Sequence, residues 1–396
     1  MKRYIPCLLL ALLILYFPAE KASASQNDSV HISLLTCSPG EEIYTLFGHT
    51  AIRYQNLSRN IDVVFNYGLF SFNAPNFIFR FALGETDYQL GVTEFDFFAG
   101  EYAYYGRSVW QQELNLAPKE KERLLFLLER NYLPENRVYR YNYFYDNCCT
   151  RPRDRIEECV MDGILYPSYP KDGSRTYRKI IHEFCKDHPW ARFGMDFCLG
   201  SAADRPINRR QMMFAPYYLM NAFAGAHVGN EIKRRPLVTS TKEIIQAKTS
   251  TDAGVWFPTP FQSSLLLFIL AVAFTIYGIR KGKGLWGIDL LLFGAAGIAG
   301  CILAFLAIFS QHPALNPNFL LIAFHPLHLL LLPYIIYCVR KRKKCAYHTL
   351  NFLVLMFFII LFPLIPQNID FAVVPLALSL LIRSASNMIL TYTKKE

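Results

Sequence analysis

The sequence has 396 residues, of which 53% are hydrophobic, and its mean hydropathy of +0.18 is too high for one ordinary soluble domain. The formal net charge of +10 would suit a nucleic-acid-binding protein, but residues 261–396 alone carry 11 basic and 3 acidic side chains. Those charges flank apolar segments and the rest of the mature chain is close to neutral, so we expect no nucleic-acid partner.

The N-terminus has the pattern of a secretory signal peptide. Lys2 and Arg3 precede an apolar run from Ile5 to Phe17, and Ala22-Ser-Ala24 offers a small-residue cleavage site. The alternative is an uncleaved anchor, but the run is shorter than the roughly 20 residues that span a membrane. We therefore predict a signal peptide at residues 1–24 and an exported mature chain.

The C-terminal part, residues 261–396, is expected to form an all-α bundle of five transmembrane helices. Its five apolar segments have spanning length: Phe261–Ile279, Leu285–Phe309, Phe319–Val339, Tyr347–Ile365 and Phe371–Tyr392. Basic residues fall in alternate loops, which by the positive-inside rule predicts a multi-pass membrane protein with residues 25–260 outside the cytoplasm and the C-terminus inside it.

Residues 25–228 are expected to form an α+β domain, joined to the bundle by a linker at residues 229–260. Alternating patterns predict a strand at Val30–Cys37 and a hairpin whose strands begin near His49 and Asp62. Further strands are expected at Tyr88–Phe95, Ser108–Asn115 and Arg137–Tyr145, and helices at Phe77–Leu83 and Pro118–Asn131.

The stretch Tyr143–Asp154 carries the strongest chemical signal. Its aromatic–polar alternation ends at Asp146 and Asn147, two residue types that cap helices, and a helical pattern begins at Thr150. Cys148 and Cys149 therefore lie at a helix N-terminus, which favours the thiolate and lowers a cysteine pKa. The alternative is that one of the pair is a core residue or half of a disulfide.

Six cysteines fall in the exported domain: Cys37, Cys148, Cys149, Cys159, Cys185 and Cys198. An oxidising compartment permits disulfides, and a Cys185–Cys198 pair is one of the pairings that spacing leaves open. No Cys-x-x-Cys or His-x-x-x-His pattern indicates a metal, so we expect neither a metal nor another cofactor.

His49 is the histidine that best matches these cysteines. A cysteine at a helix N-terminus with a histidine on a neighbouring strand is the papain-like arrangement, in which a third polar group orients the imidazole. Asn66 and Asp62, on the next strand, are the candidates for that group, and Asn66 is preferred because it lies well inside the strand. A lone histidine on a hairpin is otherwise usually structural.

Phe47-Gly-His-Thr-Ala-Ile-Arg53 and Tyr145-Asp-Asn-Cys-Cys-Thr-Arg151 together resemble the N-terminal periplasmic domain of the Bacteroidota lipoprotein N-acyltransferases, the Lnb family. That domain is similar to circularly permuted, NlpC-type papain-like folds, in which His precedes Cys, and lecithin–retinol acyltransferase is a more distant analogue. The five-helix region also looks like the C-terminal part of that family. The resemblance matches His49 to the family's Gly-His motif and Cys148 to its nucleophile, which leaves Cys149 as the weaker candidate.

The resemblance implies acyl transfer. Cys148 would take an acyl chain from a membrane phospholipid as a thioester and pass it to the α-amine of a diacylglyceryl-cysteine lipoprotein, with His49 as base. Backbone N–H groups at the helix N-terminus, including that of Cys148, would meet the oxyanion. Asn147 is a further candidate for substrate binding.

Two readings from other classes remain open. A papain-like cysteine peptidase or amidase acting on peptidoglycan would use the same Cys–His pair, although one membrane helix would suffice to tether it. A non-enzymatic membrane assembly factor would use the cysteines only structurally. A thiol-reactive acyl-phosphonate or fluorophosphonate probe would label Cys148 in either enzyme and leave a binding protein unlabelled.

Polar groups in the membrane region form a second candidate site, because ionisable residues inside a bilayer are functional suspects. His325 and His328 are expected on one face of the third span, with His312 and Asn316 in the preceding outer loop. We expect this cluster to line the access of lipid substrates. The alternative is that these histidines bond to neighbouring helices.

Overall fold

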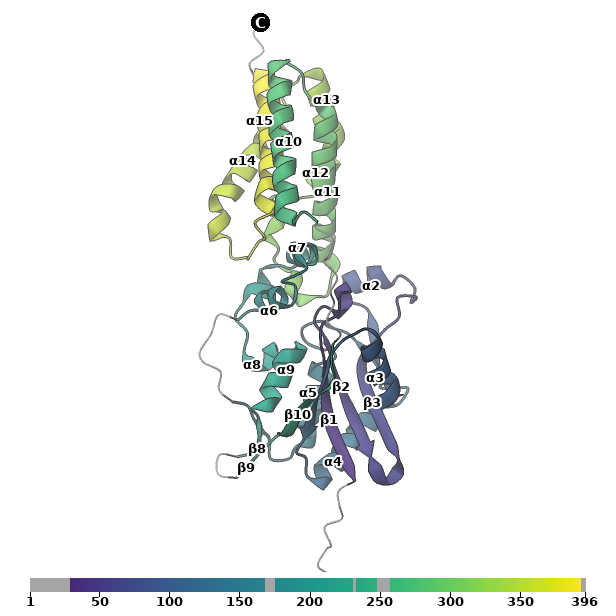
Figure 1. Ribbon diagram of the computed structural model, residues 1–396. Coiled ribbons are helices and arrows are strands. Elements are labelled where there is room, and N and C mark those ends of the chain that lie inside the picture. The colour runs from purple at the N-terminus through teal and green to yellow at the C-terminus, as the bar shows by residue number, and fades with distance from the viewer. Residues whose placement is uncertain (1–28, 168–174, 231–232, 248–256, 393–396) are drawn as a thin grey trace, which may run out of the picture.

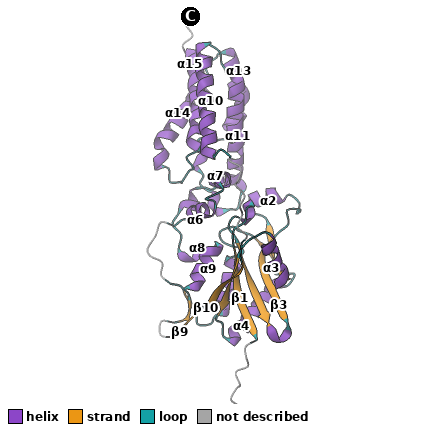
Figure 2. Ribbon diagram, in the orientation of Figure 1, coloured by secondary structure: helices purple, strands orange, loops and turns teal. Residues whose placement is uncertain are grey.

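The computed structural model describes residues 29–167, 175–230, 233–247 and 257–392. Figure 1 shows a domain built on a twisted sheet and, stacked on one end of it, a bundle of long helices. The predicted signal peptide, residues 1–24, lies outside the described residues. In Figure 2 the strands are confined to the N-terminal domain and the bundle is entirely helical, as the sequence predicts at this coarse level.

A seven-stranded sheet forms the centre of the N-terminal domain, in the order β10-β5-β1-β2-β3-β4-β6 with antiparallel neighbours. Its strands are β1 (Val30–Cys37), β2 (His49–Asn56), β3 (Ile61–Leu69), β4 (Asp87–Glu94), β5 (Val109–Leu114), β6 (Val138–Arg140) and β10 (Val238–Ile245). A second, three-stranded sheet contains β7 (Ile164–Leu165), β8 (His227–Gly229) and β9 (Arg234–Pro236). The predicted first strand and hairpin are confirmed, and Cys37 lies opposite His49 in the register of β1 and β2.

Helices cover both faces of the large sheet. Successive residues of a strand point to opposite sides, so a single strand contributes side chains to a hydrophobic core on each face. Ile32 and Leu34 of β1 enter one hydrophobic core, whereas Leu35 and Cys37 enter another. The helices of this domain are α2 (Phe77–Leu83), α3 (Phe95–Tyr104), α4 (Pro118–Tyr132), α5 (Thr150–Cys159), α6 (Tyr177–Phe184), α7 (Pro189–Cys198), α8 (Arg209–Met212) and α9 (Pro216–Ala224). Helices α2 and α4 match the prediction, whereas the prediction had no helix at α3.

The predicted strand Arg137–Tyr145 is wrong beyond Arg140. The chain turns instead, and the backbones of Asn142 and Asp146 exchange two hydrogen bonds of 3.0 and 2.9 Å. The Asn142 side chain drives this turn, because its Oδ1 accepts hydrogen bonds from the backbone N–H groups of Phe144 and Tyr145. The aromatic alternation in this stretch therefore reflects packing of a turn rather than a strand.

The predicted linker, residues 229–260, also needs correction. It contains β9 and β10, and β10 pairs with β5 to form one edge of the large sheet. The polar residues of Val238–Ile245 suit an edge strand, since most of them are exposed, while Ile244 and Ile245 pack on the core beneath α3. The N-terminal domain therefore closes with a strand that comes late in the chain.

Four helical segments of the bundle are long and apolar enough to cross a membrane: α10 (Pro260–Arg280), α11 (Trp286–Phe309), α14 (Ala346–Leu361) with the short helix η6 (Phe362–Leu364) that continues it, and α15 (Val373–Tyr392). The predicted third span is broken into η5 (Phe319–Ile322), α12 (Leu327–Leu330) and α13 (Leu332–Lys341), with a bend of 72°. If this bent pair counts as one span, the described residues contain five.

Two sequence features explain the break. Pro326 and Pro333 lie at the starts of α12 and α13, where a missing N–H and a locked φ are tolerated. The broken segment packs closely on α11, because a Cβ at Gly297 or Gly300 would lie within 2.6 Å of the backbone of Leu329 or His325. A straight span would not fit this surface in the same way.

A fully buried ion pair ties the bundle together. Arg383 Nε of α15 lies 2.7 Å from Asp289 Oδ1 of α11, and Arg383 Nη1 donates to Thr275 Oγ1 of α10 at 3.0 Å. Asn387 donates to the other carboxylate oxygen of Asp289. Charges this deep in an apolar bundle are retained only when paired, so this network gives Arg383 a structural role.

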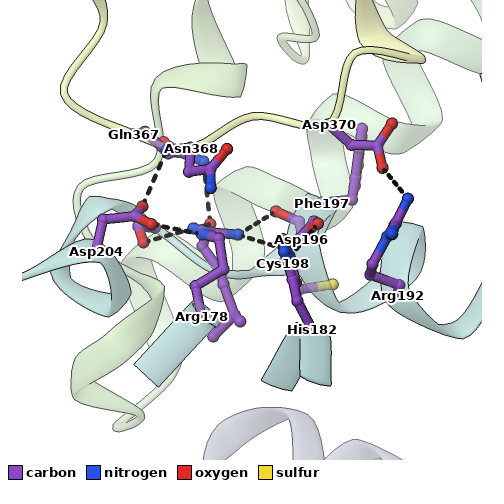
Figure 3. Close-up of polar contacts among 12 residues, drawn as sticks. Arg178, His182, Arg192, Asp196, Phe197, Cys198, Asp204, Gln367, Asn368 and Asp370 are labelled. Carbon is purple, nitrogen blue, oxygen red and sulfur yellow. Dashed lines mark hydrogen bonds and ion pairs between the residues drawn. The ribbon is translucent and has the colours of Figure 1, made fainter. Parts of the chain in front are cut away.

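A polar junction joins the N-terminal domain to the bundle, as Figure 3 shows. Arg178 of α6 is buried and donates to Asp196, to Asp204 and to the backbone oxygens of Leu199 and Gly200. The loop before α15 binds the same group from the other side. Gln367 Nε2 donates to Leu199 O at 3.0 Å, and the N–H of Asn368 donates to Asp204 Oδ2 at 3.1 Å.

A second junction lies at the end of α2. The backbone N–H of Gln311, just after α11, donates to Leu83 O at 2.9 Å, and His312 Nε2 lies 2.9 Å from Phe81 O. Gly84 ends α2 with φ +74, and a Cβ there would lie 3.4 Å from His312. Together the two junctions hold one end of the sheet against the end of the bundle.

Candidate active site

The predicted site residues meet at the end of the large sheet that faces the bundle. His49 begins β2, Asn66 lies near the end of β3, and Cys148 comes just before α5. His49 Nε2 lies 2.6 Å from Asn66 Oδ1, and the imidazole also forms a hydrogen bond with the Cys148 thiol. Because Nε2 is used by Asn66, Nδ1 is the ring nitrogen left for the sulfur.

This end of the sheet lies close to the bundle because the loop before β2 packs against the bundle. Leu46, three residues before His49, belongs to one hydrophobic cluster with Leu306 of α11 and Leu315 of the loop that follows. The strand β3, which carries Asn66, leads directly into α2 and its junction with Gln311 and His312. The strands that carry His49 and Asn66 are therefore both connected to segments that pack on the bundle.

Asn147 fixes the start of α5 and so places Cys148. Its Oδ1 accepts hydrogen bonds from the N–H groups of Cys149 and Thr150 at 2.8 and 2.9 Å, which is how a capping side chain satisfies a helix start. Its Nδ2 donates to Tyr143 O and Phe214 O. These four bonds use both donors and the acceptor oxygen of the carboxamide, which gives Asn147 a positioning role; its role in substrate binding stays a prediction.

The two adjacent cysteines have opposite electrostatic environments. The pKa of Cys148 is held well below its usual value, first by a hydrogen bond from the Cys149 thiol and then by the charge and hydrogen bond of His49, against the effect of burial. Burial raises the pKa of Cys149, whose Sγ lies 4.0 Å from Cys148 Sγ and 3.3 Å from Thr50 Oγ1. Cys149 is thus a protonated donor to the Cys148 thiolate.

The surroundings of His49 favour its positively charged imidazolium form, which complements the Cys148 thiolate. Burial alone lowers its pKa, but the Cys148 thiolate and hydrogen bonds to Cys148 and Asn66 outweigh burial, so the net pKa is raised. A lowered thiol pKa beside a raised imidazole pKa favours a thiolate–imidazolium pair over a thiol–imidazole pair. This pair is the ground state of an activated cysteine nucleophile.

Asp62, the alternative to Asn66, does not contact His49 in this structure. Its carboxylate accepts from Arg53 Nε and Nη2 at 2.8 and 2.6 Å and from Gln55 at 3.0 Å. The Arg53 guanidinium also stacks over the Phe95 ring at 3.4 Å. Asp62 is therefore part of a salt bridge on the β2–β3 hairpin, and Asn66 is the group beside His49.

The membrane histidines lie side by side as predicted, but in a broken third span rather than on one continuous helix, and their role in lipid access stays a prediction. His325 precedes α12 in the break of the third span, and its ring stacks on that of His328 at a centroid distance of 4.0 Å. His328 is fully buried, with Nε2 3.0 Å from Ala323 O and Nδ1 bonded to the Tyr347 hydroxyl. His328 therefore serves the packing of the bundle. His312 is the member of the predicted cluster that lies beside the N-terminal domain.

The described residues contain neither a disulfide nor a cluster of side chains that could bind a metal ion. All nine cysteines in the described residues have free thiols, so the Cys185–Cys198 disulfide that spacing left open is not formed. Within the same ranges, no group of three or more His, Cys, Asp or Glu side chains could hold a metal ion.

Comparison with known proteins identifies both halves of the chain. A family model described as the Lnb N-terminal periplasmic domain matches residues 16–180, and one described as the Lnb transmembrane domain matches residues 252–395. The two ranges do not overlap and together cover more than three quarters of the sequence. The chain belongs to the Lnb family.

Lnb membership makes this a multi-pass membrane protein with a periplasmic N-terminal domain, and gives it a family role in lipoprotein N-acylation. No curated protein and no solved structure matches the chain. Family membership agrees with the resemblance found in the two sequence motifs.

In this Lnb chain, sequence reasoning missed Gly68. It lies in a bulge between Asn66 and Leu69 of the β3–β4 pairing, with φ +94, where an L side chain is strained. A Cβ at this position would lie 3.5 Å from Cys148 Cβ and 4.0 Å from His49 Cε1. Gly68 therefore keeps one side of the thiol free of side-chain atoms.

Tyr139 is the second residue that the sequence did not single out. Its hydroxyl is buried, has no hydrogen-bond partner within the described ranges, and would lie 4.0 Å from a Cβ at Gly68. The Arg151 guanidinium lies 3.5 Å over the Tyr139 ring and pairs with Asp146. An unused donor beside a nucleophile is unusual, because buried polar groups are normally bonded.

The hydrogen bond from Cys149 predicts a measurable change in reactivity. Cys149→Ala should raise the pH midpoint of Cys148 alkylation by about one unit, toward the usual cysteine value of 9.0, because a donor that stabilises the thiolate is lost. Iodoacetamide labelling across a pH series, followed by mass spectrometry of the Cys148 peptide, measures this midpoint. Cys159→Ala, which removes a buried thiol at the far end of α5, is the matched control. An unchanged midpoint in Cys149→Ala would show that Cys149 does not support the thiolate.

Proposed function

We propose that this protein is a lipoprotein N-acyltransferase with Cys148 as its nucleophile. The acyl chain comes from a membrane phospholipid, is held as a Cys148 thioester, and passes to the α-amine of a diacylglyceryl-cysteine lipoprotein. The observation that carries this proposal is the Cys148–His49–Asn66 set, with its lowered thiol pKa, at the bundle-facing edge of the periplasmic domain. Membership of the Lnb family supports the same conclusion.

In the first half-reaction the Cys148 thiolate attacks the ester carbonyl of the phospholipid. A C–S bond forms, and the C–O bond to the glycerol breaks as the tetrahedral intermediate collapses. The His49 imidazolium gives its proton to the departing alkoxide, which leaves as lysophospholipid. Asn66 keeps the imidazole in the tautomer and orientation that this transfer needs.

In the second half-reaction the lipoprotein amine attacks the thioester carbonyl. His49, now neutral, takes a proton from the attacking nitrogen, an amide C–N bond forms, and the Cys148 thiolate leaves. A thioester acylates an amine readily, whereas a phospholipid ester reacts slowly with an amine. The covalent intermediate therefore makes the transfer faster than direct attack of the amine on the phospholipid. The thiolate–imidazolium pair is restored at the end of the cycle.

Both half-reactions pass through an oxyanion that needs hydrogen-bond donors. The Tyr139 hydroxyl is a candidate, because it is buried, unused within the described residues and directed at the same glycine as Cys148. The Cys148 backbone N–H at the start of α5, expected from the sequence, is a second candidate. The absence of a side chain at Gly68 leaves room for the carbonyl between these groups.

The Cys–His–Asn set supports the expected papain-like architecture. His49 and Asn66 lie on neighbouring antiparallel strands, and the nucleophile lies at the start of a helix, as in papain-like enzymes. His precedes Cys in the chain, which is the order of the permuted, NlpC-type form. We include this permuted fold in the proposal.

The membrane orientation also belongs to the proposal. Arg280 ends α10, Lys281 and Lys283 follow it, and the basic run 340–344 begins in the last residues of α13, at the end of the bundle away from the periplasmic domain (Figure 1). By the positive-inside rule this end is cytoplasmic, as is the C-terminus, and the membrane is the bacterial inner membrane. Cys148 then faces the periplasmic leaflet, where both lipid substrates reside.

A peptidoglycan peptidase or amidase would use the same Cys–His–Asn set on a peptide bond. The position of the set favours lipid substrates instead, because the segments beside His49 and Asn66 pack on the end of the bundle. An assembly factor would have no use for a thiolate–imidazolium pair.

The covalent intermediate gives the sharpest test of this function. Purified protein mixed with phospholipid alone should gain one fatty acyl group on the Cys148 peptide, and neutral hydroxylamine should remove it. His49→Ala should prevent loading, and Cys148→Ser should abolish turnover. Intact-protein and peptide mass spectrometry measure both effects. Cys198→Ala, which alters a thiol outside the site, should load normally, and acyl mass on Cys149 would contradict the assignment of the nucleophile.

Asn66 should matter for rate rather than for folding. Asn66→Ala should slow acyl loading by roughly 10- to 10⁴-fold, because a third member orients the histidine and does not itself react. Asp62→Ala is the matched control on the same strand, and it should stay close to the wild-type rate. Loading rates are measured with circular dichroism spectra as a check of folding. If Asp62→Ala loads slowly and Asn66→Ala loads at the wild-type rate, then Asp62 and not Asn66 orients the histidine.

A further inference from the structure

We propose that a strip of aromatic side chains between α2 and Cys148 binds a fatty acyl chain of a phospholipid in the periplasmic leaflet. The aromatic strip consists of Phe81, Phe77, Phe70, Tyr88 and Tyr141. This inference rests on the proposed function, since it names the path by which the donor's acyl chain reaches the nucleophile.

Helix α2 lies at the depth of the membrane surface. Phe79 packs against Phe305 of the spanning helix α11, with ring centroids 5.5 Å apart. Phe305 lies four residues before the end of α11 at Phe309, which is about 6 Å along a helix axis. The backbone bonds of Leu83 and Phe81 to Gln311 and His312 hold α2 at this height.

The exposed side of α2 is apolar. Ile78, Phe79 and Phe81 are 81%, 56% and 43% exposed, in a seven-residue helix whose single charged residue is Arg80. Arg80 does not point into this surface, because its guanidinium bonds Glu85 O and Asp87 Oδ2. Large apolar side chains at the level of a bilayer are covered by lipid, as in helices that lie in the membrane interface.

From α2 the aromatic strip runs into the domain without interruption. Phe81 stacks on Phe77 at 6.3 Å, and Phe77 stacks on Phe70 at 5.4 Å. Phe70 packs on Tyr88 at 4.9 Å, and Tyr88 stacks on Tyr141 at 4.0 Å. Each contact joins neighbouring ring centroids, so the five rings form one continuous row of packed aromatic side chains, exposed at Phe81 and buried at Tyr88.

The inner end of the aromatic strip lies in the same hydrophobic core as Cys148. Phe70, Tyr141 and Cys148 all pack against the same hydrophobic core. Burial raises the pKa of Tyr88 to about 12 and that of Tyr141 well above its usual value, and in both cases the charge of Cys148 adds to the effect. Gly68, which faces Cys148 Cβ, precedes Phe70 by two residues.

The chemistry of the aromatic strip fits an acyl chain better than a peptide or a sugar. Its outer members are phenylalanines, which offer no hydrogen bonds, and its two tyrosines lie at the inner end, where an ester would meet the thiolate. A peptide or sugar would need polar partners along its length, whereas an alkyl chain needs only apolar contact. The occupant that follows is one acyl chain of a phospholipid that enters beside α2.

Photo-crosslinking tests this binding site independently of turnover. The full-length Cys148→Ala protein is placed in phospholipid nanodiscs that contain a phosphatidylethanolamine with a diazirine on one acyl chain. After irradiation, peptides that contain Phe70 or Phe77 should be labelled. Phe77→Ser in the same background should lower this labelling at least about fivefold, and Phe77→Leu, which stays apolar, should retain it. Labelling confined to α10–α15, or unchanged by Phe77→Ser, would overturn the proposal.

A matched control comes from the opposite end of the domain. Phe126 of α4 is 60% exposed, and α4 lies at the end of the sheet away from the bundle (Figure 1). Phe126→Ser should leave the labelling unchanged. If a synthetic peptide without lipid lowers the labelling and unlabelled phospholipid does not, the aromatic strip binds a peptide rather than an acyl chain, and the proposal is overturned.

A second measurement separates this inference from the proposed function. In the protein with Cys148 intact, loading is compared between a long-chain phospholipid in nanodiscs and a water-soluble short-chain ester. Phe77→Ser should lower the ratio of long-chain to short-chain loading at least about tenfold. An unchanged ratio contradicts the aromatic strip while leaving the acyltransferase standing. No loading from either donor, with crosslinking intact, contradicts the acyltransferase and leaves the lipid site.

Discussion

The capping of α5 by Asn147 is the constraint on which the site depends. One buried carboxamide accepts from two N–H groups of the helix start and donates to two carbonyl groups, one in the preceding turn and one more than 60 residues later. This arrangement holds Cys148 opposite His49 and places Cys149 behind it as a hydrogen-bond donor. A buried amide with all four bonds made is rigid, and loss of any partner leaves a costly unsatisfied group.

The site also depends on the contact between the bundle and the end of the sheet that carries His49 and Asn66. Arg178 maintains this contact on one side, by donating hydrogen bonds to two carboxylates and three backbone carbonyls in a cluster that the loop before α15 also contacts. The end of α2 does so on the other side, through His312 and Gln311. Two separated attachments resist rotation of the domain better than one, so they hold the end of the sheet that carries His49 and Asn66 against the bundle.

Much of this arrangement follows from local sequence patterns. Period-two alternation predicted β1 and the β2–β3 hairpin, and the change from strand-like to helical pattern at Asn147 predicted the start of α5. The same reasoning failed where a side chain overrides the pattern. Asn142 bonds to the backbone and turns a predicted strand, and Pro326 and Pro333 break a segment whose hydropathy predicts one span. Gly68 and Tyr139 were missed, because a bulge and an unpaired hydroxyl are products of tertiary packing.

Transfer of an acyl group by Cys148 to the N-terminus of lipoproteins is tested most directly in cells. The measurement is the mass of N-terminal lipopeptides from cells that lack this protein and receive either the wild-type chain or the Cys148→Ala chain. Lipopeptides should be one fatty acyl group heavier with the wild type, and only diacyl lipopeptides should be found with Cys148→Ala at equal expression. Triacyl lipopeptides in the Cys148→Ala cells would contradict this role of Cys148.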